Sequence, residues 1–452
     1  MMSVQDDIKK SINEVYESRT KKSKETAAIA EKYIPSGDTR AFSYFPPYPI
    51  YGDEGEGCYL IDNDGNRYID FLNCMTAGIY GHAHPVIVKA QIAQVKKGIA
   101  HALPCDSQYQ LAKIICDRVP SVEKVRFTNT GSEADLFAMR VARAYTGRDI
   151  ILKMDGGYHG SSEYAQVNEI PDIFTSNPPQ AYISSKGVPD VILQNMRDVD
   201  FMDLDAAEEV MKAEGKKIAA IIVEPVMGAG CGGEGSYEYL HGLRDLCDKY
   251  GALLIFDEVI SFRFSMGGKQ KLVDVQPDMT TFGKLIGGGM PIGAIGGRAD
   301  VMRLFDPRVE GYVNQSGTFT GNALSMTSGV AAMQLLSEQE LKRIDSLAAK
   351  LAETVNKKIK DLGINAYAEA LGSMMAIYGT REKIENSRMA IKAMVNNGEF
   401  LRFLHLELLN NGLVCLSRGM FSLSLPMDDK IIKEAGGIIC NALEVVASLC
   451  VE

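Results

Sequence analysis

One lysine in this sequence lies where it could react with an aldehyde cofactor. Lys284 ends a short apolar run and precedes residues 287–291, a loop of three glycines, a methionine and a proline, and Asp257 ends an earlier apolar run. A lysine amine can form a Schiff base with an aldehyde, and an aspartate can keep a pyridine nitrogen protonated. Pyridoxal phosphate uses both groups, because its protonated ring is the electron sink. Taken alone, Lys284 would more often be a surface residue beside a glycine turn, so other groups must decide.

Two loops could complete a site for this cofactor. Gly131 and Ser132 stand between a predicted strand and a predicted helix, where backbone N–H groups and the helix dipole favour a phosphate. Ser132 would also serve as an ordinary helix cap. Tyr158 and His159 lie in a glycine-rich turn after the next strand. A tyrosine there can stack on a flat heteroaromatic ring, although a tyrosine packed on the core would have the same sequence context.

A glycine-rich stretch after Glu224 supports a rival interpretation. Glu224 ends an apolar run, where it could orient the hydroxyl of the cofactor ring or the surroundings of Asp257. Residues 228–233 match GxGxxG, which would indicate a nicotinamide-dependent oxidoreductase. Pro225 separates the strand from these glycines, so the tight strand-to-helix turn of a dinucleotide site is lost. That interpretation also leaves Lys284 without a role, and we set it aside.

The composition limits the classes of protein to which the chain can belong. It has 452 residues, 46% of them hydrophobic and 23% charged, as in an ordinary globular protein, and its net charge of −10 argues against nucleic-acid binding. Nine cysteines without a CxxC pair indicate reduced thiols in a cytoplasmic protein. Because no apolar run has membrane-spanning length, we expect no membrane partner. His82 and His84 lack nearby cysteine or acidic ligands, so we expect a structural or active-site-rim turn there and no metal.

The elements that must position these groups alternate between strand and helix from about residue 120 to 300. Residues 150–154, 218–223 and 252–256 are continuous apolar runs, which indicate a parallel sheet covered on both faces. This pattern predicts an α/β fold with a large, doubly wound, mostly parallel sheet, whose functional groups gather at the carboxyl ends of the strands. Further strands are predicted at 122–128, 279–282 and 293–297, and a helix at 134–145.

The sequence on both sides of this region predicts a smaller α+β domain. We expect residues 1–65 and 335–452 to form it, and residues 66–334 to form the large cofactor-binding domain. An amphipathic helix is expected within residues 3–33, either packed against a partner subunit or solvated. Residues 63–66 have the composition of a hairpin turn between two strands.

Together these segments resemble the class III, fold-type-I pyridoxal-phosphate aminotransferases over nearly the whole chain, from Arg40 to the C-terminal helix. The motifs that carry the resemblance are Asp257-Glu258-Val259, Phe282-Gly283-Lys284 with the following glycine loop, and Gly317-Thr318 with Gly321-Asn322. The resemblance implies that Lys284 is the Schiff-base lysine and that Asp257 pairs with the pyridinium nitrogen. It further implies that Gly131 and Ser132 hold the phosphate and that Tyr158 stacks on the ring.

The resemblance also implies a homodimer with shared active sites, because Thr318 would reach the cofactor phosphate of the other subunit. His159, Glu224 and Val259 lie in the loops that carry the ring contacts, and we count them among the cofactor-binding residues.

Two arginines bear on the substrate. Within the family the chain is most similar to glutamate-1-semialdehyde aminomutases and to β-amino-acid aminotransferases, and Arg40 matches a substrate-carboxylate arginine of both groups. Arginine suits this role because its guanidinium can bind a carboxylate through two hydrogen bonds. Arg418 lies where the aminomutases have an Ala-Pro-Ser type of segment, so this position and Arg263 resemble the β-amino-acid aminotransferases. The alternative for Arg418 is a surface arginine beside a turn.

We therefore expect an aminotransferase that moves an amino group from a β-amino acid, or a similar amine, to a 2-oxo acid. Within the same fold, the alternatives are an intramolecular aminomutase of the glutamate-1-semialdehyde type and an epimerase. The alternatives from other classes are the nicotinamide oxidoreductase and a non-enzymatic binding protein, and the pairing of Lys284 with Asp257 argues against both.

Overall fold

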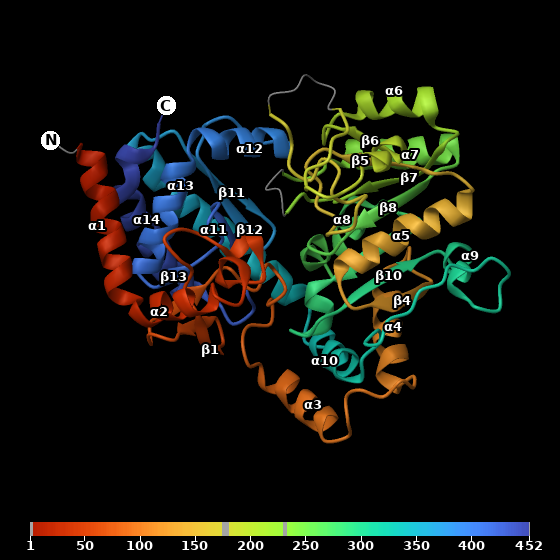
Figure 1. Ribbon diagram of the computed structural model, residues 1–452, viewed down its shortest axis with the longest axis horizontal. Coiled ribbons are helices and arrows are strands. Elements are labelled where there is room, and N and C mark those ends of the chain that lie inside the picture. The colour runs from red at the N-terminus through yellow and green to blue at the C-terminus, as the bar shows by residue number, and fades with distance from the viewer. Residues whose placement is uncertain (1–2, 174–179, 229–232, 452) are drawn as a thin grey trace. The chain divides into compact units, whose positions relative to one another are not determined.

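The computed structural model describes residues 3–173, 180–228 and 233–451 (Figure 1). The chain forms two compact units, and both are discontinuous in sequence. The first unit consists of residues 1–84, 342–383 and 393–452, and the second of residues 85–341 and 384–392. Residues 66–84 thus belong to the first unit, and the strand among them, Arg67–Asp70, pairs with other strands of that unit.

A seven-stranded sheet forms the centre of the second unit, with the order β4-β10-β9-β8-β7-β5-β6. Strands β6, β5, β7, β8 and β9 pair in parallel, whereas β10 is antiparallel to both of its neighbours. The prediction of an α/β fold with a mostly parallel sheet is confirmed. The strands are β4 (Lys124–Thr128), β5 (Ile150–Met154), β6 (Met196–Val199), β7 (Ile218–Val223), β8 (Leu253–Asp257), β9 (Met279–Gly283) and β10 (Gly293–Gly297).

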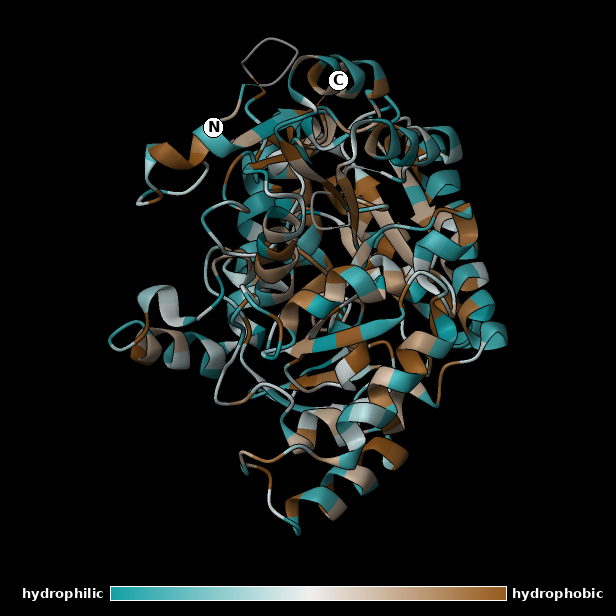
Figure 2. Cartoon of the chain, turned by 90° about the vertical axis from the view of Figure 1, so that its right-hand side faces the viewer, coloured by the Kyte–Doolittle hydropathy of each residue, from teal (hydrophilic) through white to brown (hydrophobic). Residues whose placement is uncertain are grey.

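Helices cover both faces of this sheet, because each central strand is apolar on both sides. In β5, Leu152 packs in a core that includes Leu243 of α7, whereas the next residue toward the N-terminus, Ile151, packs on the opposite face with Ala138 of α5. Figure 2 shows the strands largely brown and the helices with mixed faces. The helices are α3 (Pro85–Val95), α4 (Asp106–Arg118), α5 (Gly131–Thr146), α6 (Leu204–Glu214), α7 (Tyr237–Tyr250), α8 (Gly268–Val273), α9 (Ala299–Met302) and α10 (Ala323–Met333).

The first unit contains two smaller sheets, with the orders β1-β2-β3-β13 and β11-β12-β14. The hairpin predicted around residues 63–66 joins β2 to β3, and Gly65 has the positive φ of +87° that its turn requires. The strands are β1 (Gly52–Glu56), β2 (Tyr59–Asp62), β3 (Arg67–Asp70), β11 (Tyr367–Leu371), β12 (Met374–Tyr378), β13 (Leu413–Val414) and β14 (Met420–Ser422). The helices are α1 (Val4–Arg19), α2 (Lys21–Ala30), α13 (Gly398–Asn410) and α14 (Asp429–Val446). Two more helices, α11 (Glu338–Leu362) and α12 (Ser387–Asn396), run from one unit into the other.

The expected N-terminal helix is two helices, and its apolar face packs within its own unit. Thr20 separates α1 from α2, and its hydroxyl donates to the carbonyl of Tyr16. The side chain of Asn410 in α13 donates to the carbonyl of Ile12, and the Tyr16 hydroxyl donates to the carbonyl of Tyr48. The buried face of α1 is therefore covered by this chain itself, and neither a partner subunit nor solvent needs to cover it.

The turn that carries the two histidines belongs to the first unit as well. His82 Nε2 lies 2.7 Å from a carboxylate oxygen of Asp70, a contact between the turn and the end of β3. Across the residues that the structure describes, no helix is long and apolar enough to cross a membrane.

Candidate active site

Lys284 stands directly after β9, in a backbone conformation that is uncommon for a lysine. Its φ is +49°, in the left-handed region that favours glycine. Non-glycine residues in this region cost about 1–3 kcal/mol and gather at functional sites. The preceding Gly283 packs tightly: a methyl group there would lie 3.3 Å from a side-chain carbon of Val259 and 3.7 Å from the Cα of Gly131. The ends of three segments thus meet beside Lys284.

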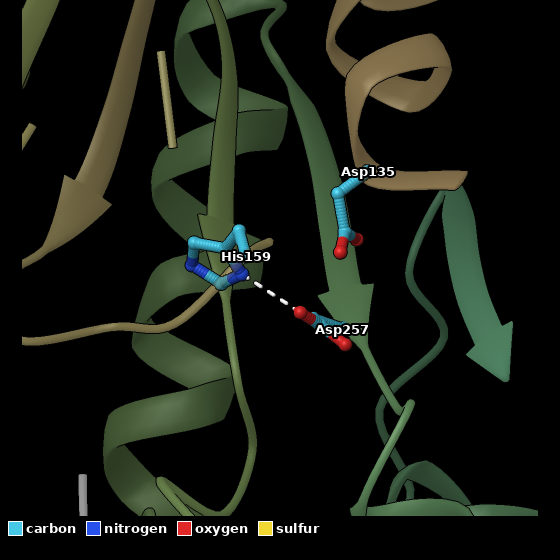
Figure 3. Close-up of side chains that lie close together, drawn as sticks. All are labelled: Asp135, His159 and Asp257. Carbon is cyan, nitrogen blue, oxygen red and sulfur yellow. Dashed lines mark hydrogen bonds and ion pairs between the residues drawn. The ribbon is translucent and has the colours of Figure 1, made fainter. Parts of the chain in front are cut away.

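Asp257 ends the neighbouring strand β8 and is 4% exposed. One of its carboxylate oxygens lies 2.8 Å from Nδ1 of His159, and the other accepts a hydrogen bond of 3.0 Å from the backbone N–H of Val259 (Figure 3). A carboxylate with such donors is held in one orientation. Burial lowers the pKa of His159, so the imidazole is neutral and donates its Nδ1 proton to Asp257.

Glu224 follows β7 and fixes the backbone of the loop after β5 that carries Tyr158 (residues 155–160), here called the tyrosine loop. Its Oε1 accepts a hydrogen bond of 2.9 Å from the backbone N–H of Tyr158. Glu224 is 4% exposed, and burial, with the nearby charge of Asp257, raises its pKa to about 8. At neutral pH this side chain is therefore mostly protonated, and it supports the loop without adding a negative charge.

The N-terminus of α5 lies against the same loop. Its cap is Thr130, not Ser132: the side chain of Thr130 accepts a hydrogen bond from the backbone N–H of Glu133. Gly131 and Ser132 therefore occupy the first helical turn, where backbone N–H groups have no acceptor within the helix. A methyl group at Gly160 would lie 2.5 Å from the Cα of Ser132, so the loop and the helix end are in close contact.

The amine of Lys284 has a lowered pKa. Burial lowers its pKa to about 8, while the negative charge of Asp257, and that of Glu224 when it is ionised, act in the opposite direction. A lysine with such a pKa is partly neutral at physiological pH, and the neutral amine is the form that attacks an aldehyde.

The donor set fits pyridoxal phosphate. Lys284 offers an amine for the aldehyde, Asp257 an acceptor for the ring N–H, and the first turn of α5 an anion site for the phosphate. Tyr158 is half-buried at the start of the loop that contacts Asp257 and α5, and it offers an aromatic face. The structure brings these residues together, with His159, Glu224 and Val259, at the carboxyl ends of neighbouring strands.

Thr318 has a different setting. It is exposed, in a loop before α10 whose cap is Asn322, which accepts from the backbone N–H groups of Leu324 and Ser325. The same loop approaches the start of α5, because Asn129 Nδ2 donates to the hydroxyl of Thr320 at 3.4 Å.

Arg40 and Arg418 belong to the first unit, whereas the residues above belong to the second. Arg40 is exposed and lines a cavity of about 340 Å³, and the half-buried Arg418 lines another of about 240 Å³. Phe45, His405 and Ser417 line both cavities, so the two arginines stand on either side of a shared wall.

The described residues on the two sides of the rival glycine-rich stretch are hydrogen-bonded to each other. Of the GxGxxG match, residues 229–232 lie outside the described residues. On either side of them, the N–H of Met227 donates to the carbonyl of Gly233, and the N–H of Gly235 donates to the carbonyl of Pro225. Because β7 ends at Val223 and α7 begins only at Tyr237, the helix does not follow the strand directly, as the tight turn of a dinucleotide site requires.

Comparisons with known proteins show the family of this chain. Residues 44–441 match the family described as aminotransferase class-III. The chain belongs to this family. It is 38% identical to a glutamate-1-semialdehyde 2,1-aminomutase of Syntrophomonas wolfei subsp. wolfei over 399 residues, which cover 87% of this chain and 90% of that protein. The class-III aminotransferases are pyridoxal-phosphate enzymes, so this chain is a pyridoxal-phosphate-dependent enzyme of amino transfer.

Two solved structures are also similar to this class-III aminotransferase. An omega-transaminase from Sphaerobacter thermophilus has a TM-score of 0.90 and 34% identity, covering 94% of this chain and 97% of that one. A beta-phenylalanine aminotransferase from Variovorax paradoxus has a TM-score of 0.87 and 31% identity, covering 97% of both chains.

Two residues of this enzyme's site region are absent from the sequence-based set. Asp135 lies on the buried face of α5 beside Asp257, and the signal that would have revealed it is an acid among the apolar residues of that face. Arg388, in the C-terminal part of the second unit, binds Asp155 at the start of the tyrosine loop, and no motif surrounds it in the sequence.

Proposed function

We propose that this class-III aminotransferase moves an amino group on a small carboxylate substrate at a carbon other than the α-carbon. The first candidate is intramolecular transfer of the glutamate-1-semialdehyde 2,1-aminomutase type. The observation that carries it is the 38% identity to such aminomutases over 90% and 97% of their lengths.

The residue roles in this proposal follow from the contacts of the second unit. Bound pyridoxal phosphate supplies an electron sink for the carbon that bears the amine. Lys284 Nζ, in its neutral form, takes the proton from that carbon as a general base. Asp257 holds the proton on the ring nitrogen, and its orientation is set by His159 and Val259.

The remaining roles concern binding of the cofactor. The backbone N–H groups of Gly131 and Ser132 bind the phosphate at the positive end of α5. Tyr158 stacks on the ring. Glu224 orients the tyrosine loop through its hydrogen bond to the Tyr158 N–H, and this contact supports its assignment to the cofactor site.

The second candidate is transfer from a β-amino acid to a 2-oxo acid. It is favoured by Arg418, which lines a cavity next to that of Arg40. A β-amino acid carries its carboxylate one carbon further from the amine than an α-amino acid does, so one fixed arginine cannot suit both donor and acceptor. In this candidate Arg40 binds the donor carboxylate and Arg418 that of the acceptor. The two transaminase structures at 31% and 34% identity support it too.

A single reaction condition separates the two candidates. Glutamate-1-semialdehyde is supplied to the holoenzyme without a 2-oxo acid. Intramolecular transfer converts it to the isomer in which the amino and oxo groups have exchanged carbons. An enzyme that is inactive in this assay, yet aminates 2-oxoglutarate with a β-amino acid as donor, would replace the first candidate by the second.

The two arginines give an independent test. Under the first candidate, Arg418→Ala leaves the rearrangement within about twofold, because no separate acceptor binds. Under the second, loss of a charge-assisted contact lowers kcat/KM for the acceptor about ten- to over a hundredfold. Arg40→Ala lowers activity toward the amine substrate under both candidates.

The proposal includes a cytoplasmic homodimer. Support for the dimer comes from Thr318, whose exposed loop approaches the start of α5, so that a second copy could reach a neighbouring phosphate site. Support for the cytoplasm comes from the nine cysteines without a CxxC pair. Light scattering at assay concentration should give the mass of a dimer, and a fully active monomer would contradict the shared site.

A further inference from the structure

Beneath the candidate cofactor site lies a second carboxyl group to which the proposed function gives no role. Asp135 belongs to the first turns of α5 and is 2% exposed. Its side chain points from the helix toward the end of β8, where Asp257 and His159 meet (Figure 3). The ligand atoms of Asp135, His159 and Asp257 all lie within 4.8 Å of one another.

The contacts of Asp135 connect it to both strands beneath the site. Its Oδ1 accepts a hydrogen bond of 2.6 Å from the hydroxyl of Thr281 in β9. One of its carboxylate oxygens lies within 4.8 Å of a carboxylate oxygen of Asp257 at the end of β8. Two buried carboxylates this close together repel each other, which favours a proton on one of them, and the protonated acid can then donate a hydrogen bond.

The surroundings decide which of the two acids carries that proton. Asp257 accepts from two donors, the Nδ1–H of His159 and the backbone N–H of Val259. Asp135 accepts from one hydroxyl, Thr281. Burial, and the nearby charge of Asp257, raise the pKa of Asp135 well above its usual value.

The other charged or titratable groups around this pair come from every neighbouring segment. They are Glu224 after β7, Lys153 in β5, Tyr158 and His159 in the loop after β5, Lys284 after β9, and Arg263, which contributes to the electrostatics at Lys284. Of the acids, Glu224 is mostly protonated at neutral pH. A second ionised carboxylate beside Asp257 would therefore face a buried region that already holds one negative charge.

We propose that Asp135 and Asp257 share a single proton, which resides on Asp135, so that Asp135 is the positioning residue of the ring-nitrogen partner. Its O–H donates to Asp257 from the side of α5, while His159 donates from the tyrosine loop. Asp257 is thus held in a fixed orientation by three donors, the third being the backbone N–H of Val259. The assignment rests on the proposed role of Asp257 toward pyridoxal phosphate.

A metal ion is the alternative occupant of this cluster, since three side chains of suitable type lie close together. The contacts favour the proton. Nδ1 of His159 and one oxygen of Asp257 are already joined at 2.8 Å, and Oδ1 of Asp135 already accepts from the hydroxyl of Thr281. A metal would have to replace these hydrogen bonds, whereas the proton completes them.

Infrared spectroscopy of the holoenzyme tests the protonation directly. Protein labelled with ¹³C in the aspartate carboxyl groups is compared with its Asp135→Asn variant at neutral pH. The difference spectrum should show the loss of one buried carboxylic-acid band and no loss of a carboxylate band. The matched control, Asp257→Asn, should lose a carboxylate band instead. Loss of a carboxylate band from Asp135→Asn would overturn the assignment.

Cofactor affinity tests the positioning role without reference to turnover. Asparagine retains a donor at position 135, so the dissociation constant of pyridoxal phosphate from Asp135→Asn should stay within about threefold. Asp135→Ala removes a hydrogen bond to a charged group, which should weaken affinity about ten- to a hundredfold. Equal affinities in the Asn and Ala variants would refute the role of the donor. Failure of the proposed function is seen in a different experiment: the wild-type enzyme would then react neither with glutamate-1-semialdehyde nor with a β-amino acid and 2-oxoglutarate.

Discussion

Removal of Arg388 should loosen the cofactor loop from a distance. The Arg388 guanidinium lies 3.0 Å from Oδ2 of Asp155 and 3.2 Å from Oδ1 of Asp200, and it donates to the carbonyl of Asp172 at 2.8 Å. Asp155 is 1% exposed and begins the loop that carries Tyr158. Arg388→Ala therefore leaves a buried carboxyl group without its cation.

The magnitude follows from the burial of this pair. The Arg388 side chain is only 17% exposed, so solvent screens the interaction weakly. Removing one partner of a buried ion pair costs about 3–5 kcal/mol. Arg388→Lys keeps the charge but not the planar fork, and should cost about 1.5–3 kcal/mol, the value of a hydrogen bond to a charged group.

Hydrogen exchange is the suitable assay, because a chain with two units need not unfold in one step. Amide protons in the loop after Asp155 should exchange at least a hundredfold faster in Arg388→Ala, since local opening becomes easier. A matched control is Arg308→Ala in the same unit, where the arginine pairs with Asp306 but is 88% exposed and should contribute little. In a double-mutant cycle, purely additive effects of Arg388→Ala and Asp155→Asn on this opening would refute the coupling.

Three further outcomes are expected. The rate at which apoenzyme captures pyridoxal phosphate should rise about tenfold per pH unit up to about pH 8 and then level off, as Lys284 loses its proton; stopped-flow absorbance checks this, and a flat profile contradicts it. Asp257→Asn should keep its fold and cofactor but lose roughly three orders of magnitude in rate, about 4 kcal/mol, so near-normal turnover would count against its role. Gly160→Ala should weaken cofactor binding in fluorescence titrations, because the residue has a φ of +86° and its methyl group would lie 2.5 Å from the Cα of Ser132.

Strands that are buried on both faces are the easiest to predict from the sequence. In β7 and β8 every residue is buried, and such strands read as continuous apolar runs. The strand β6 escapes this reasoning, because Arg197 and Asp198 interrupt it and it pairs with β5 alone at the edge of the sheet. Another missed edge strand, β1, consists only of glycines and acids and is ordered by its pairing with β2.

Some residues of the site could be predicted from local sequence motifs, whereas others are placed by contacts between segments that are distant in the sequence. Lys284 and Asp257 stand at strand ends with their own sequence motifs, and the structure brings their segments together. The cap of α5 could have been read from Thr130 and Glu133, whose spacing is that of a capping box. The position of Asp135 under Asp257 depends on how α5 crosses the sheet, and the contact of Arg388 with Asp155 joins residues 233 positions apart. Neither follows from local pattern.

The discontinuity of both units has a consequence for the order of events during protein synthesis. Strand β3 pairs with β13, so the sheet of the first unit stays incomplete until residue 414 has left the ribosome. The large sheet is synthesised earlier, but the ion pair of Asp155 cannot form until Arg388 has been synthesised. At about 5–20 residues per second, this delay amounts to roughly 10 to 50 s. The loop that carries Tyr158 thus gains its ion pair with Arg388 only near the end of translation. The nascent chain cannot complete the cofactor site before then.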